Sequence, residues 1–153
     1  MILYDVFVSP IGEIFIEYED NELLSLSYNL ENNVTFQKSD FSLEVIRQLN
    51  EYFAGQRKVF SLPLRREDKG LTKRILDEVI KIPYGEIATY QEIAIKCGNK
   101  YYSRLVGKVN HNNKFPLIIP CHRVIGKKLD LVGYNGGIDK KIKLLTLEGV
   151  KIK

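Results

Sequence analysis

One short stretch of the sequence brings together side chains that could carry out nucleophilic chemistry. Cys121, His122 and Arg123 follow directly after Pro120 and the apolar run at residues 117–119. A cysteine reacts as the thiolate, and its thiolate fraction rises beside cations or proton acceptors. Proline fixes its own φ and has no N–H group, so we expect an apolar strand to end here and to orient the thiol. The alternative is an inert buried cysteine that closes a core strand.

Two short helices are predicted ahead of this stretch. Thr89 and Glu92 form a capping-box pattern that opens a helix through Cys97, which Gly98 ends. The second helix is predicted over residues 100–110 and carries Ser103, Arg104 and Lys108. Two short helices joined by a glycine turn are typical of a DNA-binding helix-turn-helix, although helical hairpins with other functions are common.

The residues after the cysteine stretch contain a second unusual pattern. A glycine-rich loop at residues 133–137 would let the backbone approach a flat ligand closely. The last helix is predicted over residues 139–148, with Lys140 and Lys141 at the positive end of its dipole and Glu148 at the negative end. Each such placement costs ~0.3–1 kcal/mol if the charge is exposed. Local violations of this kind often mark functional positions, and tolerated surface charge is the alternative.

Taken together, these motifs resemble the active-site region of the O6-alkylguanine-DNA alkyltransferases, also called methylated-DNA–protein-cysteine methyltransferases. The resemblance extends over residues 83–150, nearly half of the chain. It rests on the stretch around Cys121, Tyr90 within residues 89–94, Arg104 to Gly107, Asn113, residues 133–137, and Glu148 with Gly149.

The resemblance implies a single-turnover repair enzyme that needs no cofactor and no metal. Cys121 would take the alkyl group from O6 of guanine, with O4 of thymine as a second candidate atom. His122 would accept the thiol proton through a water, because neighbouring side chains on a strand point to opposite faces. Glu148 would orient the imidazole, and Asn113 would tie the loop to this network. A thioether has no electrophilic carbonyl for water to attack, so each molecule would react once.

The resemblance also implies how DNA is bound. The target atom lies inside the duplex, so the nucleotide would be flipped out. The implied partner is double-stranded DNA containing O6-alkylguanine. Residues implied to bind the flipped base are Tyr90, Pro116, Val124, Tyr134, Asn135 and Gly136. Residues implied to contact DNA are Ser103, Arg104, Gly107 and Lys108, with Arg104 filling the vacated stack. The sequence departs from the small or apolar residues common in the family at Lys108, Val109 and Asn110.

We predict an α+β fold with two domains. Residues 1–30 alternate as a three-stranded antiparallel sheet, and a helix over residues 42–54 follows. Residues 1–62 would be a scaffold domain with its linker. Residues 63–153 would be a mainly helical catalytic and DNA-binding domain that contains the helix-turn-helix. The predicted apolar face of the first helix comprises Leu43, Ile46, Leu49 and Phe53.

Charge is distributed unevenly along the 153 residues. Residues 1–54 contain ten acidic and two basic residues, and the remainder contains 21 basic and nine acidic residues. This asymmetry favours a polyanionic partner for the second region. No apolar run approaches the ~20 residues needed to span a membrane. Two cysteines do not form a disulfide framework, so we expect reduced thiols and a cytoplasmic protein. We also expect a monomer that does not associate with membranes.

Three other functions are compatible with some of these residues. A cysteine hydrolase could use Cys121, His122, Asn113 and Glu148, but it would also need an oxyanion hole and a route for turnover. A zinc site could draw on Cys97, His111, Cys121 and His122, but their spacing matches no zinc motif. A non-catalytic module that binds alkylated DNA is the main alternative, although the presence of Cys121 argues against it.

Overall fold

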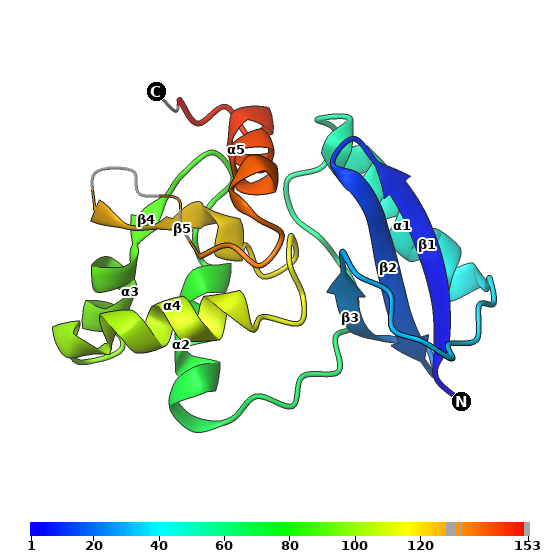
Figure 1. Ribbon diagram of the computed structural model, residues 1–153, viewed down its shortest axis with the longest axis horizontal. Coiled ribbons are helices and arrows are strands. Elements are labelled where there is room, and N and C mark those ends of the chain that lie inside the picture. Colours follow the sequence, from blue (N-terminus) through cyan, green and yellow to red (C-terminus); the bar gives the residue numbers. More distant parts are fainter. Residues whose placement is uncertain (128–130, 132, 152–153) are drawn as a thin grey trace. The chain divides into compact units, whose positions relative to one another are not determined.

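The computed structural model describes residues 1–127, 131 and 133–151 of the chain (Figure 1). It divides into two compact units, the first from Met1 to Arg66 and the second from Glu67 onward. None of its described helices is both long and apolar enough to cross a membrane.

The first unit is built on the predicted antiparallel meander. Strands β1 (Leu3–Ser9), β2 (Gly12–Glu19) and β3 (Glu22–Ser27) pair in sequence order. The β2–β3 hairpin turns at Asp20 and Asn21, which both adopt positive φ, as the twist-matched two-residue turn requires. Ile14, Ile16 and Tyr18 are the buried face of β2, as their alternation with acidic residues predicts.

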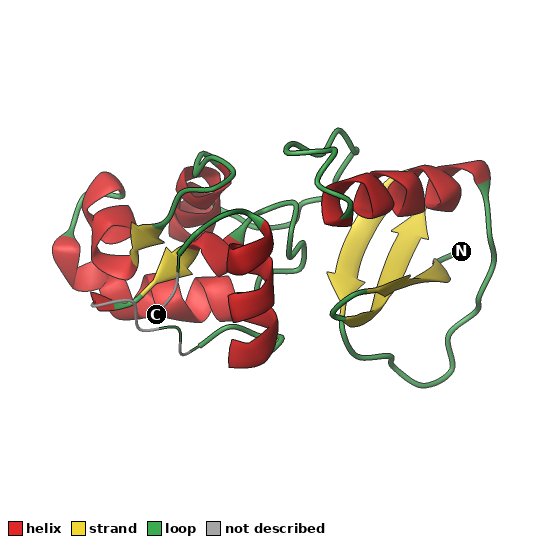
Figure 2. Cartoon of the chain, turned by 90° about the horizontal axis from the view of Figure 1, so that it is seen from above, coloured by secondary structure: helices red, strands yellow, loops and turns green. Residues whose placement is uncertain are grey.

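Helix α1 (Asp40–Phe53) lies along one face of this sheet (Figure 2). Its buried apolar residues are Val45, Leu49 and Tyr52, whereas Leu43 is 49% exposed, so the predicted apolar face is wrong in phase. Two polar residues account for the shift. Ser42 is buried because its hydroxyl donates to Asp5 Oδ2 at 2.9 Å. Gln48 is buried because its side chain bonds both backbone groups of Ser61.

The second unit contains the predicted helix-turn-helix. Helix α2 (Gly70–Ile80) precedes the short strand β4 (Ala88–Thr89). Helix α3 (Tyr90–Lys96) then begins at the Thr89–Glu92 capping box, and a 3₁₀-helix (Lys100–Tyr102) leads into α4 (Ser103–His111). A shared core holds α2, α3 and α4 together. It comprises Ile75, Leu76, Val79, Ile93, Ala94, Val106 and Val109.

A two-stranded parallel pairing connects the helix-turn-helix to the cysteine stretch. Strand β5 (Val124–Ile125) pairs with β4, so that Ala88 lies opposite Val124 and Thr89 opposite Ile125. Strands β4 and β5, which are far apart in the sequence, thereby lie side by side (Figure 1). This pairing fixes the first turn of α3 beside the cysteine stretch. Helix α5 (Ile138–Leu147) closes the unit.

Candidate active site

The thiol lies on a 3₁₀ turn, not at the end of a strand. Residues Cys121–Arg123 form this turn, in which the Arg123 N–H donates to the Pro120 carbonyl at 2.9 Å. The apolar run at residues 117–119 pairs with no strand among the described residues, so the predicted strand is wrong. Its apolar composition reflects burial within a folded loop, because Leu117 and Ile119 are at most 2% exposed. Cys121 and His122 therefore do not alternate across a sheet.

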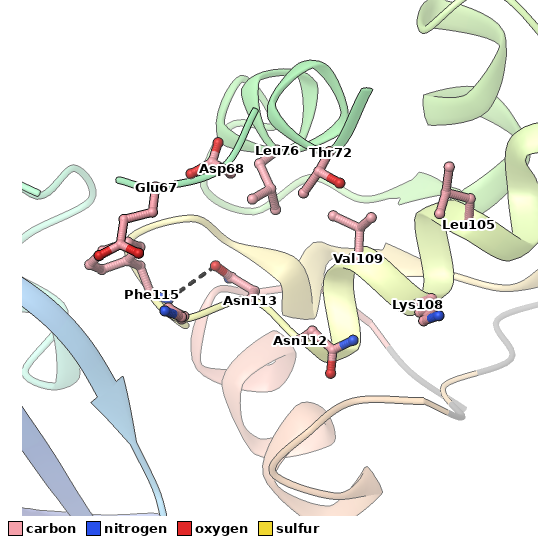
Figure 3. A pocket seen from close by; sticks show the side chains of 11 residues that line it. Glu67, Asp68, Thr72, Leu76, Leu105, Lys108, Val109, Asn112, Asn113 and Phe115 are labelled. Carbon is pink, nitrogen blue, oxygen red and sulfur yellow. Dashed lines mark hydrogen bonds between the residues drawn. The ribbon is translucent and has the colours of Figure 1, made fainter. Parts of the chain in front are cut away.

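Asn113 holds this loop from inside. Its Nδ2 donates to the Ile119 carbonyl at 2.8 Å, and its Oδ1 accepts from the Phe115 N–H at 3.0 Å (Figure 3). Between these anchors Leu117 adopts φ +76°, a left-handed conformation that a branched residue rarely takes. Such strain costs about 1–3 kcal/mol and persists only where surrounding contacts impose it. Asn113 thus fixes the backbone that delivers Cys121.

His122 is bound to Glu148 in a site closed to solvent. The His122 Nε2 and Glu148 Oε2 atoms are 2.7 Å apart, and both side chains are fully buried. A carboxylate accepts, so Nε2 carries the hydrogen and Nδ1 of the neutral ring is left as the proton acceptor. Nδ1 has no hydrogen-bond partner among the described residues.

Arg123 completes the contacts of Glu148, a role that sequence reasoning missed. Its Nε donates to Oε1 at 2.8 Å and its Nη2 to Oε2 at 3.0 Å. The third guanidinium nitrogen, Nη1, donates to the Ile82 carbonyl at 2.7 Å, and the group packs 5.7 Å from the Tyr84 ring centroid. This two-pronged contact fixes the orientation of Glu148 toward His122.

Lys141 is the second residue whose place the sequence did not reveal. Its side chain is 1% exposed, so the alternative of tolerated surface charge is wrong for this lysine. Nζ donates to the Val124 carbonyl at 2.7 Å and lies 5.9 Å from the Tyr90 ring centroid. Helix α5 therefore supplies the site from both ends, with Lys141 in its first turn and Glu148 at its C-cap.

The electrostatics of the site favour a neutral resting pair. Burial raises the pKa of the Cys121 thiol, while a hydrogen bond from Asn113 and the charge of Lys141 act in the opposite direction. Burial lowers the pKa of His122, and the contact with Glu148 opposes this shift. Both shifts favour the neutral forms, a protonated Cys121 thiol and an uncharged His122 imidazole.

A hollow of about 390 Å³ opens beside the helix-turn-helix. It is lined by Tyr90, Ser103, Arg104, Gly107, His111 and Gly133, so the structure brings together four of the predicted base-binding and DNA-binding residues. Gly133 has φ +100°, and a Cβ there would stand 3.4 Å from the Tyr90 hydroxyl. A side chain at Gly133 would therefore be strained by its backbone. Among the other residues predicted to bind the base, Val124 lies on β5 and the rest lie outside helices and strands. Pro116, Val124 and Tyr134 are buried, Gly136 is partly exposed and Asn135 is exposed.

A larger hollow of about 440 Å³ lies between α2 and α4 (Figure 3). Asn113 lines it, but Cys121 and His122 do not, so the reacting groups are elsewhere. Lys108 and Val109 also line this hollow, which separates Lys108 from the hollow that holds Ser103, Arg104 and Gly107. Asn110 is buried, and neither atom of its amide has a partner among the described residues.

The residues of the alternative zinc site do not gather in the structure. Cys97 is the buried C-cap residue of α3, where burial raises the pKa of its thiol. His111 is exposed at the end of α4, and its Nδ1 lies 3.2 Å from the Gly133 carbonyl. Within residues 1–127, 131 and 133–151, no cluster of three or more His, Cys, Asp or Glu side chains could hold a metal ion.

Family models match both units of the chain. Residues 2–66 match the model described as 6-O-methylguanine DNA methyltransferase, ribonuclease-like domain. Residues 70–150 match the model described as 6-O-methylguanine DNA methyltransferase, DNA binding domain.

Individual proteins are similar over nearly the whole length. A methylated-DNA–protein-cysteine methyltransferase of Methanosarcina acetivorans is 40% identical over 152 residues, which cover 95% of this chain and 97% of that protein. The structure of a Mycobacterium tuberculosis O6-methylguanine methyltransferase superposes with a TM-score of 0.89 at 36% identity and covers 97% and 93% of the two chains. A structure of Mycobacterium tuberculosis OGT in complex with DNA has a TM-score of 0.88 at 36% identity, with 95% and 92% covered.

Proposed function

The chain belongs to the 6-O-methylguanine DNA methyltransferase family, and from this premise we propose that it repairs DNA by irreversible transfer of the O6-alkyl group of guanine to Cys121. The observation that carries the proposal is the buried His122–Glu148 pair, in which His122 directly follows Cys121 in the sequence. His122 Nε2 donates a hydrogen bond to Glu148 Oε2 at 2.7 Å, so Nδ1 of the ring is left to accept a proton.

The proposed reaction is a displacement at the alkyl carbon. His122 takes the thiol proton, directly or through one water, and the Cys121 sulfur forms a bond to the alkyl carbon. The bond from that carbon to O6 breaks and its electron pair passes to the purine. The purine anion then takes up the proton that His122 removed from the thiol, carried through water, and becomes guanine. Glu148 stabilises the imidazolium while it exists, as an orienting carboxylate does in other nucleophile–base pairs.

Arg123 and Lys141, whose roles the sequence did not reveal, support this proton transfer and displacement. Arg123 binds both oxygens of Glu148, so the carboxylate keeps its orientation when His122 becomes charged. Lys141 places a cation beside the forming thiolate and holds the Val124 carbonyl at 2.7 Å. In the family resemblance this carbonyl, with that of Cys121, reads the exocyclic amine of guanine. Lys141 would therefore position a specificity-determining group as well as stabilise charge.

DNA would be engaged through α4 and the hollow beside Tyr90. Arg104 is exposed on the rim of this hollow, where it could replace the flipped nucleotide in the stack. Ser103 and Gly107 lie on the same side of α4. The excess of basic residues after residue 54 supplies the sequence-independent attraction to phosphates that a lesion-searching protein needs.

We further infer that the two units have different functions. The second unit holds every side chain of the proposed reaction, while the first, with its satisfied polar contacts at Asp5 and Gln48, would serve as a scaffold. We also propose that the protein is a cytoplasmic monomer. A reducing compartment fits the reaction because Cys121 must remain a free thiol before it reacts.

Intact-mass measurement after incubation with a duplex that carries one O6-methylguanine tests the proposed function. The protein should gain one methylene mass, once, and the DNA should lose it. A Cys97→Ser variant should react like the unaltered protein, whereas Cys121→Ser should not react. Tight binding of the modified duplex without any mass change would instead identify a non-catalytic alkylated-DNA-binding module.

A further inference from the structure

One titratable side chain at the rim of the hollow takes no part in the proposed reaction. His111 is the last residue of α4, and it is exposed. Its Nδ1 lies 3.2 Å from the carbonyl oxygen of Gly133, at the start of the glycine-rich loop. The chain contains only two histidines, and the other, His122, is fully buried. Any histidine-dependent response of the free surface must therefore come from His111.

The contact with Gly133 assigns the two ring nitrogens. A carbonyl oxygen can only accept, so Nδ1 carries a hydrogen. The same bond persists when the ring is protonated, because Nδ1 is a donor in both forms. Nε2 then changes from an acceptor in the neutral ring to a donor in the cation. No described residue forms a hydrogen bond with Nε2 of His111.

The surroundings of the ring favour an anionic ligand. On α4 itself, Arg104 shares the hollow and Lys108 is one turn away. Across the hollow are Tyr90 and the Gly133 carbonyl, and Lys141 lies above the Tyr90 ring. No carboxylate lines the hollow within the described part of the chain. The C-terminal end of a helix also favours a protonated histidine.

We propose that protonated His111 donates from Nε2 to a DNA phosphate at the rim of the hollow, so that duplex binding is coupled to proton uptake. The proposal rests on the proposed function, since it assigns a DNA contact beside Arg104. The bond to Gly133 links the two elements, because the same ring would hold the loop that carries Tyr134 and a phosphate of the bound strand. A charge-assisted bond of this kind joins α4, the loop and the DNA at one point.

The direction of the pH effect follows from linkage. A phosphate stabilises the protonated ring, so the complex binds more protons than the free protein and affinity rises as pH falls. We expect about a tenfold tighter Kd for unmodified duplex at pH 5.5 than at pH 8, which corresponds to ~1.4 kcal/mol.

Two substitutions separate the roles of the ring nitrogens. His111→Asn keeps a donor where Nδ1 meets Gly133 but has nothing at the position of Nε2. His111→Gln places a neutral donor near the position of Nε2 and cannot titrate. Fluorescence anisotropy with unmodified duplex at constant ionic strength should show the pH response in the unaltered protein and a nearly flat profile in both variants.

Nuclear magnetic resonance gives a readout that does not depend on repair. The two histidine Cε1–H signals can be assigned by the loss of one in His111→Asn. At pH 7, addition of duplex should move the His111 signal toward its protonated position. A His111→Asn protein that retains the full pH response, or a His111 signal that stays neutral with saturating DNA, would overturn the proposal.

Failure of the proposed function would be seen separately. Free O6-benzylguanine needs no DNA contact, so its reaction with the unaltered protein tests the proposed function apart from the role of His111. If the unaltered protein is not alkylated, the proposed function fails, while the binding and resonance measurements still decide the role of His111.

Discussion

The second unit buries several ionisable side chains around Glu148 that interact electrostatically with one another. Arg123 and Lys141 are cations, Glu148 is an anion, and His122 rests neutral. One positive charge is thus in excess among these groups while Cys121 is a thiol, and transfer of the thiol proton to His122 leaves that sum unchanged. Isolated buried charges are costly, whereas hydrogen-bonded sets with balanced charge are tolerated. The charge of Lys141 opposes the effect of burial on the pKa of the Cys121 thiol and so favours its ionisation.

Replacing Lys141 with methionine tests this balance. Without the cation, the pKa of the Cys121 thiol should rise further, because burial would be opposed by fewer favourable contacts. We expect alkylation by free O6-benzylguanine to slow about tenfold at pH 7, a barrier increase of ~1.4 kcal/mol. The pH profile of the rate should also move to higher pH.

The matched control is Lys143→Met, which removes an exposed lysine from the same helix. It should change neither the rate with the free base nor the pH profile. A Lys141→Met protein that is slower at every pH by the same factor would show that this lysine acts by shape alone.

Helix α4 carries two faces with different surroundings. Arg104 lines the hollow with Tyr90 and Gly107, whereas Lys108 lines the larger hollow with Val109. Helix α3 is fixed against the reactive turn by the β4–β5 pairing, so Tyr90 is held in place before DNA arrives. The helix-turn-helix therefore has a preformed hollow on one side of α4, which we propose receives the flipped base.

Arg104→Ala should separate nucleotide flipping from the chemical step. Flipping is required in a duplex but not for a free base. We expect repair of O6-methylguanine in duplex DNA to slow by about tenfold or more, and the reaction with free O6-benzylguanine to be unchanged. Single-turnover rates with both substrates measure the difference.

Lys108→Ala is the comparison variant for this experiment. It should weaken duplex binding in a salt-dependent way through a lost phosphate contact, with little effect on the rate at saturating DNA. Equal slowing of Arg104→Ala with both substrates would place Arg104 in the base pocket instead of the vacated stack.

The stability of the whole chain should reflect two opposite pKa shifts. The folded state holds His122 neutral, since burial lowers its pKa, so below the ordinary histidine value near 6.5 the unfolded chain binds more protons. The folded state also holds Cys121 and Cys97 protonated, since burial raises the pKa of both thiols. Above the ordinary thiol value near 8.5 the unfolded chain therefore binds fewer protons.

The free energy of unfolding should consequently be greatest between about pH 6.5 and 8.5 and fall on both sides. Urea titrations monitored by circular dichroism at a series of pH values measure this profile. Cys121→Ser should reduce the alkaline loss of stability, and a further Cys97→Ser substitution should reduce it again. If the free energy of unfolding falls equally steeply at alkaline pH in all three proteins, the loss comes from groups other than these two cysteines.

Local pattern was sufficient for much of the fold. The alternation in residues 13–19, the Asp20–Asn21 turn and the Thr89–Glu92 capping box predict β2, its hairpin and the start of α3, and the structure confirms each. These features are decided by residues only a few positions apart. The resemblance to the family implied that Glu148 orients His122, and the two side chains are in contact at 2.7 Å.

Other features depend on partners that lie far away in the sequence. The phase of α1 was missed because Ser42 and Gln48 are buried by bonds to Asp5 and Ser61. The roles of Arg123 and Lys141 were missed because a charged side chain is ordinarily exposed, and only folding brings Glu148 and the Val124 carbonyl to them. The loop at residues 117–119 has a strand's composition but is closed by Asn113. Periodicity reports which residues avoid water, whereas tertiary contacts decide which polar groups can be buried without loss of their hydrogen bonds.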